Sequence, residues 1–181
     1  MTPFRIEAIA TEIAREVRET LRAPFHGFPA YAELAADAAP CRHCLKTFAP
    51  GVDRRILFTH DRFAGIESCP QPGPVYIHEY HCPRYPPDAG FPEQLRSSPR
   101  TLEAYAYSRH LVAQDRVDHQ DYEAAIDHLF AREKVVYILV NSTAAGCYTF
   151  RIERERASSP NSGKPTIHVP GLPLCFQGFT V

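Results

Sequence analysis

Residues 74–83 decide the fold, and they read Pro-Val-Tyr-Ile-His-Glu-Tyr-His-Cys-Pro. β-Branched and aromatic residues fill this stretch and a proline bounds it on each side, as is typical of a β-strand over residues 75–82. Successive side chains of a strand point to opposite faces of its sheet, so every second residue is predicted to share one face. That face carries Tyr76, His78, Tyr80 and Cys82. This composition is unusual for a simple hydrophobic core, so it marks the strand as a candidate functional site.

The segments around this strand predict an α+β fold. Further strands are expected at residues 4–6, 41–48, 54–60, 102–117, 135–140 and 147–153. Two main helices are expected at residues 11–22 and 119–133, where apolar residues recur with helical spacing, and a short helix near residues 31–36. Because strands mostly follow strands, this order favours an antiparallel or mixed sheet with two main helices over a doubly wound α/β fold.

The length of 181 residues suits one compact domain, which we place at residues 1–156. Residues 157–181 form a tail that is rich in proline, glycine and serine at first and apolar at its end. We expect that apolar end to dock on the body of the protein or on a second subunit, which leaves a homodimer as an open alternative.

Composition narrows the partners and the compartment. With a net charge of -1 the chain has no long-range positive field, so nucleic acid is not an expected partner. No apolar run reaches the roughly 20 residues of a membrane span. The first 21 residues mix charged and apolar side chains, unlike a signal peptide, so we expect a cytoplasmic protein. In that compartment the six cysteines are free thiols, metal ligands or a redox pair rather than structural disulfides.

Cys41 and Cys44 form a C-x-x-C motif, whose spacing suits zinc ligation or a redox dithiol. There is no second motif of this kind, so two small buried side chains are an equally open interpretation. If residues 41–48 form a strand, the two thiols point to opposite faces. This geometry, and the absence of a long helix after the pair, make a thioredoxin-type role the least favoured reading.

The candidate metal ligands are Cys41, Cys44, Cys82 and His78, with zinc as the ion that thiolate and imidazole ligands favour. We expect Cys41 or Cys44 to lie close to Cys82 or His78. Cys82 and His78 are also the candidate catalytic residues, with Cys82 at a sheet rim before Pro83. An ideal strand would separate the pair by about 13 Å, so His43 is the more plausible partner of Cys82.

A second set of residues suits binding of a small molecule. Its aromatic members are Tyr76, Tyr80, Tyr105 and Tyr107, and its basic members are Arg42, Arg84 and Arg151. Arginine side chains bind carboxylate or phosphate groups, and tyrosines line mostly apolar pockets. Each arginine taken alone is more often a surface ion-pair partner.

Three stretches resemble a bacterial family known only as domain of unknown function 1203. They are Pro40-Cys41-Arg42-His43-Cys44-Leu45, Gly73 to Glu79 with Cys82, and Gly146-Cys147-Tyr148-Thr149-Phe150-Arg151. The resemblance covers about residues 4–154. It implies one small, compact domain that contains the cysteine-bearing segments, and it implies no activity.

Three classes of function therefore stay open. The first, which we favour slightly, is a small enzyme or metalloprotein with a Cys/His site. The second is a non-catalytic small-molecule-binding or accessory protein with a pocket of tyrosine and arginine side chains. The third is a thiol redox protein that uses Cys41 and Cys44.

Overall fold

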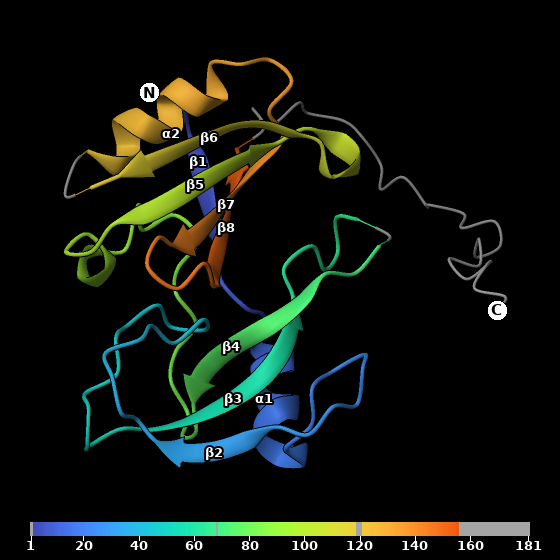
Figure 1. Cartoon of the computed structure of the whole chain (residues 1–181), viewed down its shortest axis with the longest axis vertical. Helices are drawn as coiled ribbons and strands as arrows, with labels where there is room; N and C mark the ends of the chain where they lie inside the picture. Colours follow the sequence, from blue (N-terminus) through green and yellow to red (C-terminus); the bar gives the residue numbers. More distant parts are fainter. Residues whose placement is uncertain (1, 68, 119–120, 156–181) are drawn as a thin grey trace, which may run out of the picture.

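The computed structural model describes residues 2–67, 69–118 and 121–155, and it contains two antiparallel sheets with one α-helix each (Figure 1). The five-stranded sheet has the order β1 (Phe4–Glu7), β8 (Tyr148–Arg154), β7 (Tyr137–Ser142), β5 (Arg100–Tyr105) and β6 (Leu111–Val117). The three-stranded sheet has the order β2 (Tyr31–Leu34), β3 (Arg54–Asp61) and β4 (Pro72–His78). Every pairing is antiparallel, so the predicted α+β class is confirmed.

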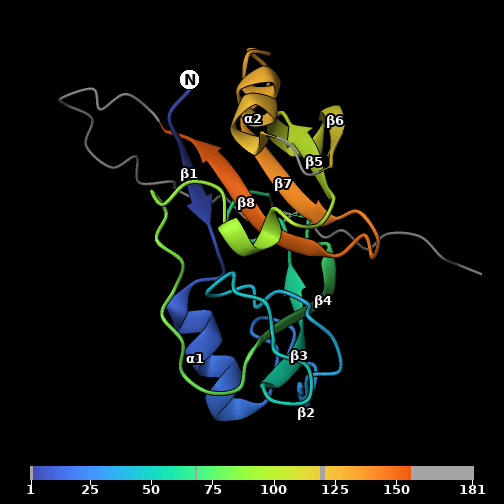
Figure 2. The same ribbon diagram turned by 90° about the vertical axis from the view of Figure 1, so that its left-hand side faces the viewer.

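The two helices lie at opposite ends of the molecule. Helix α2 (Tyr122–Phe130) covers the five-stranded sheet, and α1 (Thr11–Thr20) lies against the three-stranded sheet (Figures 1 and 2). Helix α2 begins at Asp121, whose side chain accepts a hydrogen bond from the backbone N–H of Ala124. Helix α1 ends at Leu21, which has a left-handed φ of 49°. Two 3-10 turns, Glu93–Leu95 and Tyr107–Arg109, complete the elements.

The molecule has two hydrophobic cores, and strand β7 lies between them. Its side chains point alternately into one core and the other. Ile138 and Val140 face α2 and pack with Ile126 and Leu129. On the other face, Tyr137 and Leu139 belong to the core that also contains Val17 of α1 and Ile56 and Ile77 of the small sheet. The second core therefore joins the two sheets.

Two predicted elements are wrong. Residues 31–36 contain strand β2 instead of a short helix, because a ladder with β3 pairs Tyr31 with Leu57 and Leu34 with Arg54. Residues 41–48 form a turn instead of a strand, and Pro40 and Thr47 at its base make an isolated antiparallel bridge. Residues 31–34 form a strand because β3 lies beside them. Residues 41–48 do not form a strand because the backbone turns near the C-x-x-C motif.

The remaining elements follow the prediction, with shifted ends. The most important shift is in β4, which starts at Pro72 and ends at His78, four residues before Cys82. Neither described helix is long and apolar enough to cross a membrane. The tail at residues 157–181, with its expected docking, lies outside the described residues, and the proposed domain limits stay predictions.

Candidate metal centre

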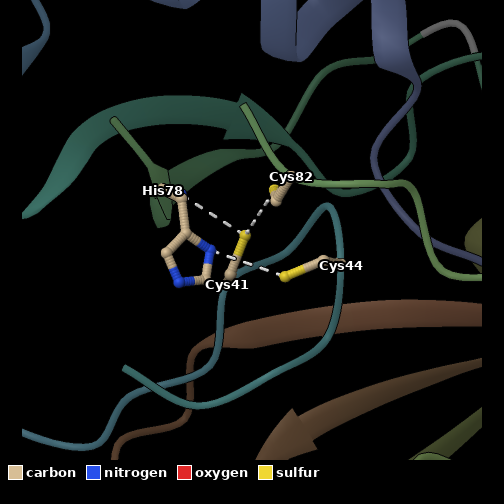
Figure 3. A group of neighbouring side chains, drawn as sticks. All are labelled: Cys41, Cys44, His78 and Cys82. Atoms are coloured by element: carbon tan, nitrogen blue, oxygen red, sulfur yellow. Dashed lines mark hydrogen bonds between the residues drawn. The ribbon is translucent and has the colours of Figure 1, made fainter. Parts of the chain in front are cut away.

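Four side chains meet between the C-x-x-C turn and the end of β4, namely Cys41, Cys44, His78 and Cys82 (Figure 3). The ligand atoms of this cluster all lie within 4.8 Å of one another. Cys41 Sγ is 4.0 Å from Cys82 Sγ, and Cys44 Sγ is 3.5 Å from His78 Nδ1. A tetrahedral zinc ion with ordinary Zn–S and Zn–N bonds sets such atoms about 3.5–3.8 Å apart. The four atoms lie close enough together that the cluster could hold one metal ion, and the predicted clustering is confirmed.

The C-x-x-C motif reaches this geometry because residues 41–45 fold into a tight turn. The backbone N–H of Leu45 donates to the Cys41 carbonyl at 2.9 Å, and the N–H of Cys41 donates to the Lys46 carbonyl at 2.8 Å. Leu45 has a left-handed φ of 57°, a conformation that no strand contains. The turn directs both thiols into the cluster, whereas the predicted strand would have pointed them apart.

Backbone N–H groups also point at the sulfur atoms of this turn. Cys41 Sγ accepts hydrogen bonds from the backbone of Cys44 and, at 3.4 Å, from the backbone N–H of His78. Cys44 Sγ accepts a hydrogen bond from the backbone of Lys46. Donors aimed at sulfur stabilise the thiolate form, which is the form that binds a metal.

His78 and Cys82 come together because β4 stops at His78. The chain bends at residues 79–80, and Cys82 returns to the same place. The separation of about 13 Å that an ideal strand would give is therefore wrong. Tyr80, predicted to share the face of His78, lies beyond the strand and is 68% exposed.

Cys82 has two further donors outside the cluster. His43 Nδ1 and Arg18 Nη2 each lie 3.3 Å from Cys82 Sγ. Thr11 Oγ1 lies 3.2 Å from Nε2 of His43, so both ring nitrogens of His43 have a hydrogen-bonding partner. The predicted proximity of His43 to Cys82 is confirmed. The roles of Arg18 and Thr11, both on α1, were missed.

His78 presents Nδ1 to the cluster and Nε2 to a carboxylate. Asp53 Oδ2 lies 3.8 Å from His78 Nε2. Metal-bound histidines commonly direct their second ring nitrogen to such a group, which fixes the tautomer and the ring orientation. Asp53 is held in turn by the backbone N–H of Ala49, which donates to Oδ2 at 2.7 Å.

The ionisation of the metal-free cluster follows from these contacts. Burial opposes ionisation of Cys41, but hydrogen bonds with Cys44, Cys82 and His78 outweigh it and lower the pKa of the Cys41 thiol. Hydrogen bonding to Cys41 raises the pKa of Cys44, which remains a neutral donor. Hydrogen bonding to Cys41 and Cys82 raises the pKa of His78 to about 10, against the effect of burial. These directions favour a thiolate at Cys41 beside an imidazolium at His78.

The turn that carries Cys41 and Cys44 is bonded to four other segments. The bonds run from Ile9 N–H to Arg42 O, Arg42 N–H to Tyr76 O, Tyr85 N–H to His43 O and Arg42 Nε–H to Tyr148 O, each at 2.9 Å. The partners belong to the segment before α1, to β4, to the proline-rich loop and to β8. The turn therefore lies at the junction of both sheets.

The three arginines predicted to clamp an anion together are each engaged with different partners. Arg42 is buried and donates to the carbonyls of Tyr148 and Pro40. Arg84 pairs with Glu7, and Arg151 pairs with Glu153. The predicted joint clamp has no support in these contacts, and the binding role of each arginine stays a prediction.

The four tyrosines predicted to line a pocket differ in exposure and in neighbours. Tyr76 lies under the guanidinium of Arg55, whose Cζ is 3.9 Å from the ring centroid. Tyr105 is buried and stacks on Tyr137, while Tyr107 is 69% exposed. Tyr76 and Tyr105 pack in the same hydrophobic core, and the binding role of the tyrosines stays a prediction.

Residues 38–154, well over half of the chain, match the family described as Protein of unknown function (DUF1203). The chain belongs to this family. All four ligand residues lie within the family region, whereas Thr11 and Arg18 precede it. No curated protein and no solved structure matches the chain.

Proposed function

We propose that the protein is a zinc metalloprotein in which Cys41, Cys44, Cys82 and His78 bind one ion. The observation that carries the proposal is the mutual spacing of the four ligand atoms, all within 4.8 Å. Three sulfur atoms and one imidazole form a ligand set that favours zinc over magnesium, calcium or manganese, which prefer oxygen. The ligands fill the four positions of a tetrahedral ion, as in structural zinc sites.

The charge around the cluster supports this assignment. Three thiolates, one neutral imidazole and a divalent ion carry one net negative charge. Arg18 places its guanidinium 3.3 Å from Cys82 Sγ, and within the described ranges no carboxylate pairs with this arginine. A buried anionic centre needs such compensation, because an uncompensated buried charge is costly.

The place of the centre in the fold indicates what the ion does. The ligands come from the C-x-x-C turn, from the end of β4 and from the loop after it, and the turn is bonded to both sheets. An ion that joins these segments adds a further link between them and closes the chain loops that connect its ligands. The proposed role is therefore to hold the small sheet, α1 and the proline-rich loop in register with the five-stranded sheet.

A catalytic role for Cys82 and His78 is the alternative. It requires Cys82 to be a free thiolate, and the His43 contact at 3.3 Å is the observation that favours it. The two proposals differ in one measurable property, because a zinc-bound Cys82 is protected from alkylation and a free thiolate is not.

Metal content and thiol reactivity test the proposal together. Protein purified without chelator should contain one zinc per chain by elemental analysis, and Cys82 should react with iodoacetamide only after chelation. Cys41→Ser should lose the zinc, whereas Cys69→Ser, a change at an exposed free cysteine, should keep it. Substitution with cobalt should give the visible absorption of a tetrahedral site with thiolate ligands. Wild-type protein without metal and with freely reactive Cys41, Cys44 and Cys82 would refute the proposal.

A further inference from the structure

A cavity of about 300 Å³ lies directly beside the proposed metal centre. Its walls are residues 44–46 of the C-x-x-C turn, residues 83–86 of the proline-rich loop and residues 92–94. Its lining includes Leu45, Tyr85 and three prolines, and its surface is largely apolar. Its size is at the lower limit of small-molecule sites.

Two of these walls start at a metal ligand. One wall begins with Cys44 itself, and another begins at Pro83, the residue after Cys82. Hydrogen bonds also join the segments that form the walls, because Tyr85 N–H donates to the His43 carbonyl at 2.9 Å. Thr47 N–H donates to Gln94 Oε1 at the same distance. The cavity is therefore preformed when the cluster is assembled.

The charged groups at the cavity favour an anion. Lys46 is exposed at the cavity, and among residues 2–67, 69–118 and 121–155 no carboxylate pairs with its ammonium group. Arg84 adds a guanidinium whose Nη2 donates to Glu7 and to the Ala8 carbonyl, while its buried Nε has no partner. Among the residues that line the cavity, the acidic one is Glu93, which is 90% exposed and lies 3.2 Å from Arg96. Lys46 has no described ion-pair partner, and Arg84 has hydrogen-bonding capacity left. Together with the apolar walls they suit a ligand that has one negative charge and an apolar body.

We infer that this cavity binds a small organic carboxylate, with its carboxylate at Lys46 and Arg84 and its apolar part against Tyr85, Pro83 and Pro86. The inference rests on the proposed function in one respect, because the metal holds both walls in place. Binding of the carboxylate and binding of zinc are then coupled, and each should strengthen the other by the same factor.

Benzoate is a suitable probe, with benzamide as its uncharged counterpart of the same shape. Zinc-loaded full-length protein should bind benzoate in a saturation-transfer NMR titration and should bind benzamide much more weakly. Lys46→Met should weaken benzoate binding about fivefold, as expected for one partly exposed charged contact. Lys134→Met, which removes another exposed lysine without a described partner, should leave it unchanged. Removal of zinc should weaken benzoate binding at least about fivefold, within the usual range of coupling between sites.

The outcomes separate this inference from the proposed function, because zinc content is measured on the same samples. A protein that holds one zinc but binds benzoate and benzamide equally, or not at all, overturns the inference and leaves the zinc proposal intact. Unchanged benzoate binding in Lys46→Met, or after removal of zinc, overturns it as well. A protein that never holds zinc refutes the proposed function, whatever benzoate does.

Discussion

The two ends of the molecule are built on different principles. At one end, the core between α2 and the five-stranded sheet consists of apolar and aromatic side chains, among them Ile126, Leu129, Ile138 and Val140, and the sheet also buries Arg100, Asn141 and Thr149. At the other end, the three-stranded sheet and the C-x-x-C turn bury Arg42, His43 and Arg55 together with the thiols. Burial of apolar surface is therefore the main source of stability at the first end. The stability of the second end depends on satisfied polar contacts and on the Cys/His cluster.

The buried arginines show how the polar end is held. Arg55 has a side chain only 4% exposed, and it pairs with Glu33 and Asp37 while it stacks on Tyr76. Such networks are stabilising when every member has a partner and costly when one is removed. A metal-binding cluster within this network is thus well placed to control the stability of that end alone.

Removal of the metal should have the largest effect, and it should act on one end of the molecule. Chelation should lower the free energy of unfolding by several kcal/mol, on the order of 5, because binding energy of the folded form is lost. Hydrogen exchange should become faster in β3 and β4 (Arg54–Asp61 and Pro72–His78) than in β7 (Tyr137–Ser142). An equal increase in hydrogen exchange in all three strands would show that the metal stabilises both ends of the molecule alike.

A cavity at the apolar end should lower stability and spare the metal. Leu129 is fully buried under the five-stranded sheet, so Leu129→Ala should reduce the free energy of unfolding by about 2–5 kcal/mol. Zinc content should remain at one per chain. Arg132→Ala, at an exposed position after the same helix, should change stability by less than about 0.5 kcal/mol in urea unfolding. Loss of zinc in Leu129→Ala would contradict the separation of the two ends.

The apolar end could be predicted well from the sequence. Apolar periodicity located α2 and strands β5 to β8, because their side chains alternate or repeat according to which face is buried. The polar end was harder to predict, because the order of apolar and polar residues along the chain does not show which segments pair there. Strand β2 has an exposed, mixed composition and exists because β3 lies beside it.

The cluster itself was predicted from residue types, and for a partly wrong reason. Thiol and imidazole groups at Cys41, Cys44, His78 and Cys82 suggested a metal site, but the strand expected at residues 41–48 would have separated the first two. The left-handed conformation of Leu45 permits the turn, and such a conformation is not expected of leucine. The one sequence signal for Arg18 is its position on helix α1, because it lies seven residues after Thr11 and so on the same helix face.

Arg18 should affect the metal more than the fold. Arg18→Met removes the donor to Cys82 Sγ and the charge that compensates the centre, so zinc affinity should fall about 10–100-fold, as for other residues that support metal ligands. Competition with a zinc-binding dye would measure this change. The cobalt-substituted variant should also show a shifted sulfur-to-metal absorption band, which a loss of packing alone would not produce. Arg15→Met, on the exposed face of the same helix, is the control and should bind zinc as tightly as the wild type.

His60 should produce the smallest effect, and it concerns acid sensitivity. This side chain lies between Phe58 and Tyr148, and burial lowers its pKa to about 4. In the unfolded chain a histidine has a pKa of about 6.5, so the unfolded state takes up a proton first as pH falls. The contribution of neutral His60 to stability is therefore complete above about pH 6.5 and is lost as pH falls toward 4.

Between pH 7 and pH 5 the free energy of unfolding of the wild type should fall by about 2 kcal/mol or less relative to that of His60→Phe, which keeps the aromatic contacts and cannot be protonated. Urea unfolding of both proteins at the two pH values measures this difference, and any effect of acid on the metal centre cancels between them. Parallel losses in the two proteins would show that His60 does not sense acid, and that the pH dependence lies at the metal end.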